Sequence, residues 1–368
     1  MNELRIEKIK RIVVRGTNWV GDSVMTVPAL RALRRLLPEA EITLAVRPWA
    51  KDLFAEADFI DELLVYDRRG MLSVVPQIQE WRRRNFDLAV LFQNAFEAAF
   101  IPFMASVSFR IGYATEARQF LLTNPVPLPH WRSSRHEIFY YLYLIAALEQ
   151  RLLGTNTICD TEPDAALYLS ESNKAKALVL LRANGIAENK TVVAICPGSI
   201  NSRAKRWPAE RYALLADRLI KESGAQVLLV GSNDELDVSN DVVSRMRYKP
   251  TVLTGKTSLD QVTAVLGQVD LVVTNDTGPA HMAAALGTPT LVIFGPTNPL
   301  TTRPFSPLSE VLRHPPDCAP CMLRDCPIDH RCMTAITVDE VFERTVILIN
   351  RKKVARNARI LCDSVGVN

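Results

Sequence analysis

The sequence lacks the features of a membrane-spanning, secreted or nucleic-acid-binding protein. No apolar run approaches the roughly 20 residues that a transmembrane helix needs, and the longest one, 95–109, contains Glu97 and Pro102. Residues 1–5 carry charge and lead into a strand-like run without the apolar core of a signal peptide. The formal net charge of +4 is too small to argue for nucleic acid. We therefore expect a cytoplasmic protein with no nucleic-acid partner.

Two further absences narrow the class of fold. No short-period repeat exists, so the chain is not a repeat array. The first glycine-rich turn, 16–21, does not have the G-x-G-x-x-G spacing of dinucleotide-binding proteins, which argues against a dehydrogenase. The chain has 368 residues, of which 48% are hydrophobic and 23% charged, which is enough to fill two cores.

Strand-like and helix-like segments alternate in both halves of the chain. We expect strands at 11–14, 42–46, 63–66, 88–92, 191–195, 226–230, 271–274 and 290–294, and helices at 28–37, 136–153, 172–185, 209–223, 258–266, 279–286 and 338 to about 352. Such alternation predicts parallel strands joined by right-handed helical crossovers. Three prolines predict a loop at 123–129, and the Pro- and Cys-rich segment 295–335 is also expected to be a loop.

The turn at 16–22 ends a predicted strand and precedes a predicted helix, and it contains one carboxylate, Asp22. A carboxylate there can accept a proton from an attacking hydroxyl group. Asp22 can equally cap the helix that follows, and the spacing alone does not separate the two interpretations.

A second turn, 197–199, follows the first strand of the second half and is succeeded by Lys205 and Arg206. Its Pro-Gly pair lets a ligand approach the backbone closely. The two cations can neutralise a diphosphate, Lys205 as a mobile point charge and Arg206 as a fork. The alternative is a solvated basic loop.

A third turn, 275–281, again joins a strand to a helix. Gly278 allows close approach, and the amides of Thr277, Gly278 and Ala280 could hold phosphate oxygens at the positive end of the helix. Asp276 would repel phosphate, so it is expected to order the loop or to contact a hydroxyl. His281 either faces the diphosphate or is a structural histidine.

Cysteine and arginine clusters complete the candidate sites. Four cysteines, Cys318, Cys321, Cys326 and Cys332, are predicted either to bind a structural zinc ion or to remain reduced thiols. Arginines gather at 82–84, at Arg132 with Arg135, and at 351–356. They are either solvated helix faces or sites that attract an anionic substrate or membrane.

Taken jointly, segments 15–49, 197–219, 275–299 and 318–333 resemble the lipopolysaccharide heptosyltransferases, glycosyltransferase family 9. The resemblance implies a GT-B fold, with two Rossmann-like domains whose parallel sheets face a central cleft. It assigns the acceptor to an N-terminal domain at 1–165 and the ADP-sugar to a C-terminal domain at 166–350. The tail at 351–368 is expected to pack back on the N-terminal domain.

The resemblance also implies an inverting, metal-independent transfer of heptose from ADP-heptose onto the heptosyl inner core of lipid-linked lipopolysaccharide, with contact to the cytoplasmic face of the inner membrane. No cofactor is required, and the zinc question stays open. Within the family, the Trp19 loop and the Cys-rich loop favour the second heptosyltransferase over the first. The implied base is Asp22; the implied donor residues are Ser199, Lys205, Glu235, Asp276, Thr277, Gly278 and His281; the implied acceptor residues are Asn18, Trp19, Arg132 and Arg135.

One departure from the family pattern affects the donor loop. Pro279 stands where relatives often carry Leu, and it removes an N–H group that could hold phosphate. Three alternatives remain open: a heptosyltransferase with another core acceptor, a nucleotide-sugar epimerase on the same fold, and a non-enzymatic nucleotide-sugar-binding protein. An acceptor requirement for ADP release would separate the transferase from the epimerase.

Overall fold

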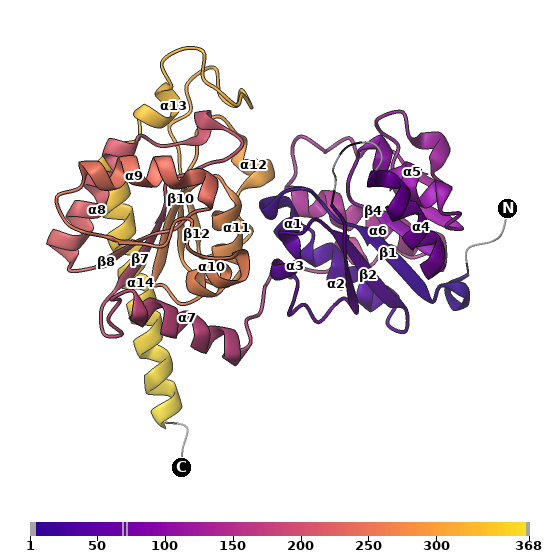
Figure 1. The fold of residues 1–368 in the computed structure, drawn as a ribbon, viewed down its shortest axis with the longest axis horizontal. Coiled ribbons are helices and arrows are strands. Elements are labelled where there is room, and N and C mark those ends of the chain that lie inside the picture. Colours follow the sequence, from indigo (N-terminus) through magenta and orange to yellow (C-terminus); the bar gives the residue numbers. More distant parts are fainter. Residues whose placement is uncertain (1–4, 68–69, 71–72, 366–368) are drawn as a thin grey trace. The chain divides into compact units, whose positions relative to one another are not determined.

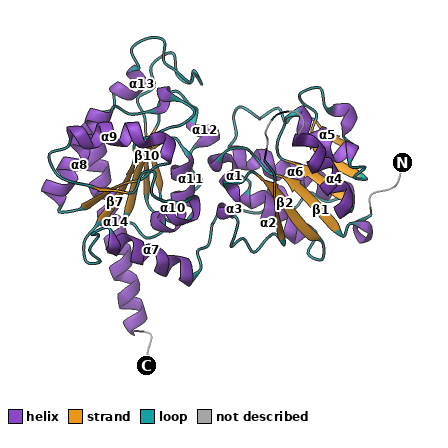
Figure 2. Cartoon of the chain, in the orientation of Figure 1, coloured by secondary structure: helices purple, strands orange, loops and turns teal. Residues whose placement is uncertain are grey.

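A computed structural model of the chain describes residues 5–67, 70 and 73–365, with side chains through Lys352 and at Val354. The chain divides into two compact units, Met1–Tyr168 and Leu169–Asn368. The sequence had placed this division after residue 165. Each unit is a parallel sheet covered by helices, as predicted, and the two are described separately (Figures 1 and 2).

The sheet of the first unit has the strand order β3-β2-β1-β4-β5-β6, and every neighbouring pair is parallel. Its strands are β1 (Arg11–Arg15), β2 (Glu41–Val46), β3 (Glu62–Val65), β4 (Leu88–Leu91), β5 (Phe109–Tyr113) and β6 (Asn124–Val126). The central strand β4 is buried along its whole length, which is why its sequence is apolar without alternation. The order reverses between β1 and β4, and open α/β sheets bind ligands beyond the strand ends at such a point.

Helices cover both faces of this sheet. They are α1 (Val20–Met25), α2 (Val27–Leu36), α3 (Ala50–Leu53), α4 (Val74–Arg84), α5 (Phe96–Met104) and α6 (Glu137–Leu153). Helix α2 packs on α6, and α4 packs on α5. Pro28 lies in the first turn of α2, where it costs no helical hydrogen bond. His136 caps α6, because its ring Nδ1 accepts the amide of Ile138 at 3.2 Å.

The second unit repeats the same topology. Its strand order is β12-β11-β10-β7-β8-β9, again all parallel, so its reversal lies between β7 and β10. The strands are β7 (Val192–Cys196), β8 (Gln226–Leu229), β9 (Thr251–Val252), β10 (Leu271–Asn275), β11 (Thr290–Ile293) and β12 (Ser309–Leu312). The carboxyl ends of β7 and β10 are therefore the expected ligand edge of this unit.

Helices again flank the sheet, with α8 and α9 on one side and α10 and α11 on the other (Figure 1). The helices are α7 (Glu171–Ala183), α8 (Ala209–Ser223), α9 (Leu236–Arg245), α10 (Leu259–Leu266), α11 (Gly278–Ala285), α12 (Pro299–Thr302), α13 (Arg331–Thr334) and α14 (Val338–Val365). Ser258 caps α10 through a capping box with Gln261, and Gly224 ends α8 in the left-handed conformation that glycine favours.

Three predictions from the sequence were wrong in the secondary structure. Segment 123–129 was expected to be a loop, but 124–126 forms β6; this strand pairs only with β5, and an edge strand tolerates Pro125. Segment 295–335 was also expected to be a loop, yet it contains α12, β12 and α13. The last helix, expected to end near residue 352, continues to Val365. Its packing against the first unit stays a prediction.

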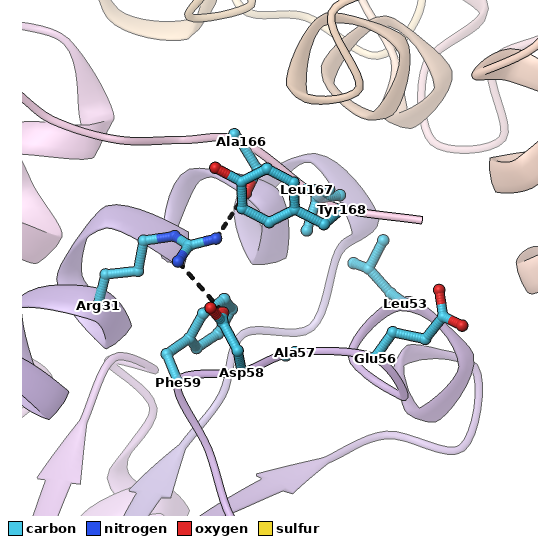
Figure 3. Close-up of a pocket in the computed structure, with 9 residues that line it drawn as sticks. All are labelled: Arg31, Leu53, Glu56, Ala57, Asp58, Phe59, Ala166, Leu167 and Tyr168. Carbon is cyan, nitrogen blue, oxygen red and sulfur yellow. Dashed lines mark hydrogen bonds and ion pairs between the residues drawn. The ribbon is translucent and has the colours of Figure 1, made fainter. Parts of the chain in front are cut away.

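The end of the first unit, residues 164–168, is held against helix α2 by interactions with Arg31 (Figure 3). The Arg31 guanidinium pairs with Asp58 at 3.2 Å and donates to the carbonyl of Ala166 at 3.2 Å. It also pairs with Asp164 at 3.4 Å. The Tyr168 ring lies 5.2 Å from the guanidinium carbon. These groups belong to a small pocket lined by Arg31, Leu53, Glu56, Ala57, Asp58, Phe59, Ala166, Leu167 and Tyr168.

Within residues 5–67, 70 and 73–365, no helix combines the length and the apolar character needed to cross a membrane.

Candidate functional site

The carboxyl ends of β7 and β10 carry most of the predicted donor residues. Pro197, Gly198 and Ser199 follow β7, and Asp276 and Thr277 follow β10. The cation that precedes α8, Arg206, donates from Nε at 3.1 Å and from Nη2 at 2.9 Å to the carbonyl oxygen of Ser199. Ser199 is buried. Arg206 thus holds the turn at 197–199 in place through the backbone carbonyl of Ser199. It is not a solvated residue of a basic loop.

Asn275, the last residue of β10, connects these loops through its side-chain amide. The amide nitrogen donates to the carbonyl oxygens of Pro197 at 2.8 Å and Gly198 at 3.1 Å. The amide oxygen accepts from the backbone nitrogen of Trp207 at 3.0 Å and from the hydroxyl of Tyr212 at 2.9 Å. All four hydrogen-bonding positions of the amide are filled, and the residue is fully buried. This residue begins the third turn, 275–281, but the sequence did not indicate its role.

Lys205 and Asp276 form an ion pair at this edge. The ammonium of Lys205 lies 2.8 Å from a carboxylate oxygen of Asp276 and donates to its carbonyl oxygen at 3.1 Å. The hydroxyl of Thr297, beyond β11, donates to the same carboxylate oxygen at 2.7 Å. Asp276 is 3% exposed, whereas 26% of the Lys205 side chain is accessible. The carboxylate therefore orders the loop and holds a partly exposed cation at this edge.

Helix α11 begins at this loop, with Thr277 as its N-cap and Gly278 and Pro279 in its first turn. The prediction that the Ala280 amide is available to phosphate was wrong, because this amide donates to the Thr277 carbonyl at 3.1 Å. Pro279 supplies no N–H group. The amides of Thr277 and Gly278 remain as the backbone donors that the first turn of a helix leaves without intrahelical partners. His281 is buried one turn into α11.

Glu235 lies directly over Gly198, in the turn at 197–199. Its carboxylate accepts from the amide of Ser232 at 2.8 Å and from the hydroxyl of Ser232 at 3.0 Å, which is one half of a capping box. A Cβ atom at Gly198 would stand 2.1 Å from Oε1 of Glu235. Position 198 must therefore be glycine for Glu235 to reach this place. All the predicted donor residues lie on connections at the ligand edge of the second unit or on the helix that begins there. They are Ser199, Lys205, Glu235, Asp276, Thr277, Gly278 and His281.

In the first unit, Asp22 lies in the first turn of α1, close after the carboxyl end of β1. The N-cap of α1 is Trp19, not Asp22, and no side chain caps the helix. The N-cap interpretation of Asp22 is therefore wrong. Asn18 is half-buried in the connection from β1, and Trp19 is 51% exposed. The structure thus places Asn18, Trp19 and Asp22 together on one connection.

Glu137 joins Arg132 to the neighbourhood of Asp22. The guanidinium of Arg132 binds Glu137 in bidentate fashion, at 2.5 and 2.9 Å, and lies 4.1 Å over the ring of Tyr140. Burial raises the pKa of Glu137; Arg132 opposes this shift and the nearby charge of Asp22 adds to it. The three charged groups therefore interact. Nothing in the spacing of the sequence had indicated Glu137.

Arg135, by contrast, is exposed, with its guanidinium 3.8 Å over the ring of Phe139 and 5.3 Å from that of Trp131. It extends the cationic connection before α6. Its assignment to the acceptor stays a prediction.

The Cys-rich segment forms no metal centre in the described part of the chain. No three His, Cys, Asp or Glu side chains among the described residues are arranged to hold a metal ion. Cys318, Cys321, Cys326 and Cys332 are free thiols, and His330 is bonded to the carbonyl of Ala204 at 2.6 Å. Burial, with a contribution from the three neighbouring thiols, raises the pKa of Cys332 to about 11. The zinc hypothesis gains no support from this geometry.

Comparison with known proteins identifies the family. Residues 76–331 match the family model described as "Glycosyltransferase family 9 (heptosyltransferase)". The chain belongs to this family. It is 28% identical over 315 residues to lipopolysaccharide heptosyltransferase 2 of Escherichia coli (strain K12), covering 82% of this chain and 88% of that one. It is 30% identical over 321 residues to lipooligosaccharide heptosyltransferase 2 of Haemophilus ducreyi, with the same coverage.

The fold of this glycosyltransferase agrees with a solved structure of E. coli ADP-heptose LPS heptosyltransferase II. The TM-score is 0.78 at 26% identity, covering 93% of this chain and 99% of the other. The predicted GT-B class and the predicted glycosyltransferase activity are confirmed by these relatives. The roles of the individual site residues are not tested by them and stay predictions.

Proposed function

We propose that this family 9 member transfers L-glycero-D-manno-heptose from ADP-heptose onto the heptosyl inner core of lipopolysaccharide, as a heptosyltransferase II. The observation that carries the proposal is the Lys205–Asp276 cluster at the ligand edge of the second unit. The names of the similar proteins, heptosyltransferase 2 in E. coli and H. ducreyi, support the choice of donor and acceptor.

The second unit is assigned the nucleotide-sugar. Lys205 would place its ammonium against the diphosphate, while Asp276 and Thr297 keep that ammonium at the loop. Thr277 and Gly278 would add backbone amides at the positive end of α11. As ADP leaves it gains negative charge, and preorganised cations and N–H dipoles stabilise such charge most effectively where it develops. His281 and Glu235 complete the proposed donor site.

The first unit is assigned the acceptor, with Asp22 as general base. As the acceptor oxygen bonds to the anomeric carbon, its proton passes to the Asp22 carboxylate. The bond from that carbon to the diphosphate oxygen breaks, ADP leaves with the electron pair, and the configuration inverts. Asn18, Trp19, Arg132 and Arg135 would contact the acceptor. Arg132 is already paired with Glu137, so an acceptor phosphate would have to compete with that carboxylate.

The acceptor is a lipid-linked oligosaccharide, so the proposal includes peripheral contact with the cytoplasmic face of the inner membrane. It requires no metal for the transfer step, since the charge on the leaving group is met by Lys205 and backbone amides. A family member that uses another core acceptor is the second candidate, because the same donor edge would serve it equally well.

The test is a transfer assay with ADP-heptose and truncated core acceptors that carry zero, one or two heptoses. We expect ADP release only with acceptor, and fastest with the acceptor that carries one heptose. Preference for the acceptor with none or two would assign the protein to the second candidate. ADP-heptose turnover that is independent of every acceptor would overturn the transferase proposal and favour an epimerase.

A further inference from the structure

Helix α5 is apolar on both its buried and its exposed sides. Its inner side is formed by Ala98, Ala99, Ile101 and Pro102, which are buried. Its outer side exposes Phe96 by 42%, Phe103 by 43% and Met104 by 39%. Glu97 is its one charged residue. A surface helix of a soluble domain normally places polar side chains outward, so a helix that is apolar all round is covered by something on its outer side.

The exposed side of α5 continues onto the neighbouring 3-10 helix η3 (Gln119–Leu121). Phe120 of η3 is 73% exposed, more than any other large hydrophobic side chain in the described part of the chain. Its ring lies 6.2 Å from the ring of Phe96, which stacks at 6.1 Å on Phe100. We call Phe96, Phe100, Phe103, Met104 and Phe120 the α5 aromatic surface.

Arginines border this surface. The exposed Arg82 donates to the carbonyl oxygen of Met104 at 2.6 Å, and the guanidinium of Arg110 lies 5.5 Å over the ring of Phe103. Arg110 also donates to the carbonyl of Leu121 at 2.7 Å. Carbonyl partners satisfy the N–H groups of an arginine but do not neutralise its charge. The border of the surface therefore carries positive charge.

The carboxylates of helices α4 and α5 are held by other arginines, whereas Glu116, four residues before Phe120, is exposed. Glu80 of α4 binds Arg83 and Arg84, and Glu97 pairs with Arg15 at 3.5 Å. They consequently oppose the charges of Arg82 and Arg110 less than free carboxylates would. Exposed aromatic rings beside unneutralised arginines suit an interface with apolar chains below and anionic headgroups above.

The position of the surface in the fold agrees with the proposed acceptor. Helix α5 begins after β4, so Phe96 lies near the carboxyl edge of the sheet, and its ring contact with Phe120 connects η3 to that position. The connection that carries Asp22 leaves β1 at the same edge, because parallel strands end on one side. An acceptor anchored in a bilayer would meet the enzyme at this edge.

We propose that the α5 aromatic surface docks on a bilayer that contains anionic lipids, with its rings at the boundary between headgroups and acyl chains and with Arg82 and Arg110 against lipid phosphates. This rests on the proposed function only for the lipid-linked nature of the acceptor. Occupation by a second copy of the chain or by another part of this chain is the competing outcome.

The experiment is co-sedimentation of the full-length protein with phosphatidylcholine vesicles, with and without roughly one-third phosphatidylglycerol. The test variant is Phe103→Ser combined with Phe120→Ser, since both side chains are exposed and their loss leaves the core intact. The matched control is Leu300→Ser combined with Ile328→Ser, two side chains of the second unit that are 66% and 62% exposed. A charge variant, Arg82→Glu, separates the electrostatic part.

We expect the test variant to lower the vesicle partition coefficient at least tenfold, and the control to leave it unchanged. Arg82→Glu should weaken binding to the vesicles with phosphatidylglycerol more than to those without it. Equal partitioning of wild type and test variant, or no binding of the wild type, overturns the proposal. So does a wild-type dimer that the test variant dissociates in light scattering, because a second copy then covers the surface.

Transfer to a soluble, truncated acceptor is measured in parallel, and the test variant should retain it. If the wild type transfers no heptose to any soluble acceptor, the proposed function fails while vesicle binding is still decided by its own variants. The two failures are therefore distinguishable.

Discussion

The two sheets share one strand order, yet their ligand edges are built differently. In the second unit, two residues at the edge are buried and held by several bonds: Asn275 makes four hydrogen bonds, and Asp276 holds Lys205 and Thr297. In the first unit, Trp19 is half exposed and Asp22 is only partly buried. A small nucleotide-sugar rewards a site arranged before binding. The lipid-linked acceptor proposed for the first unit is larger, and a more exposed edge gives it access.

Replacing Asp22, the carboxylate at the ligand edge of the first unit, should have the largest effect on the rate of transfer. Asp22→Asn removes the proposed base, and loss of general-base catalysis typically costs about 10²–10⁴-fold in rate. We expect kcat to fall within that range while ADP binding, measured by calorimetry, is unchanged, because the donor residues belong to the other unit. Asp52→Asn, at an exposed carboxylate of α3, is the control. Heptose transfer by Asp22→Asn near the wild-type rate would show that another group takes the proton.

Removing Lys205, the cation at the ligand edge of the second unit, should affect the step that involves the ADP-heptose donor instead. Lys205→Ala takes away the charge proposed to meet the diphosphate, and a comparable loss of one stabilising group costs on the order of 10²-fold in kcat. Lys205→Arg should restore part of the activity, because it keeps the charge but not the geometry. Steady-state kinetics with either substrate varied would reveal the effect.

The exposed Lys221→Ala of α8 serves as the control for Lys205→Ala. A change confined to the KM of the acceptor would contradict the assignment of Lys205 to the donor. Urea unfolding of Lys205→Ala should accompany the kinetics, since the variant leaves the buried carboxylate of Asp276 without its cation.

The hydrogen bonds that hold the loops at the ligand edge of the second unit can be removed at Asn275. In Asn275→Asp the two bonds donated to Pro197 and Gly198 are lost, and each buried acceptor left without a donor costs about 1–3 kcal/mol. We expect the free energy of unfolding in urea to fall by about 2–6 kcal/mol and the KM for ADP-heptose to rise, with the acceptor KM unchanged. Tyr212→Phe removes one accepted bond only and should cost about 1 kcal/mol. Equal losses in the two variants would mean that the donated bonds are not what holds the loops.

The smallest effect concerns the acid stability of the first unit. Burial alone would raise the pKa of Glu149, but hydrogen bonds from Thr157, Ile158 and Thr155 lower it to about 2. A carboxyl group with a depressed pKa stabilises the fold above its unfolded pKa, near 4.3, and this stability is lost as the pH falls toward 2. The contribution is on the order of 2 kcal/mol.

Glu149→Gln should therefore unfold more readily than the wild type at neutral pH, and the difference should shrink between pH 4.5 and 2. Denaturant titrations at several pH values would measure it. Glu171→Gln, at an exposed carboxylate of α7 in the second unit, is the matched control variant. A difference between Glu149→Gln and wild type that stays constant down to pH 2 would contradict the assignment.

The fold was predictable where apolar segments and turns mark the chain locally. Residues 209–223 read as a helix closed by glycine, and α8 has these bounds. The short edge strands β6 and β12 were missed, because one contains a proline and the other lies in a segment rich in loop-forming residues. Their strand character comes from the neighbouring strand, which the local sequence does not contain.

The candidate site divides in the same way. Asp22, Lys205 and Asp276 were predictable because each follows a strand-and-turn signal. Asn275 was not, because its bonding partners lie 63 to 78 residues away along the chain. Thr297 was missed for the same reason, because it bonds Asp276, which is 21 residues away along the chain. Glu137 is only five residues from Arg132, but its interaction with Asp22 arises from the fold.

The contact between Gly198 and Glu235 has a consequence for how the sequence can change. A Cβ at position 198 would meet the Glu235 carboxylate at 2.1 Å and its Cγ at 2.8 Å, and moving the carboxylate aside would break its hydrogen bonds to Ser232. Gly231 is constrained from the other side, since a Cβ there would stand 3.2 Å from Oε2. Positions 198, 231 and 235 are thus expected to vary as a set, so that a side chain gained at one glycine is accepted only together with a shorter residue at 235.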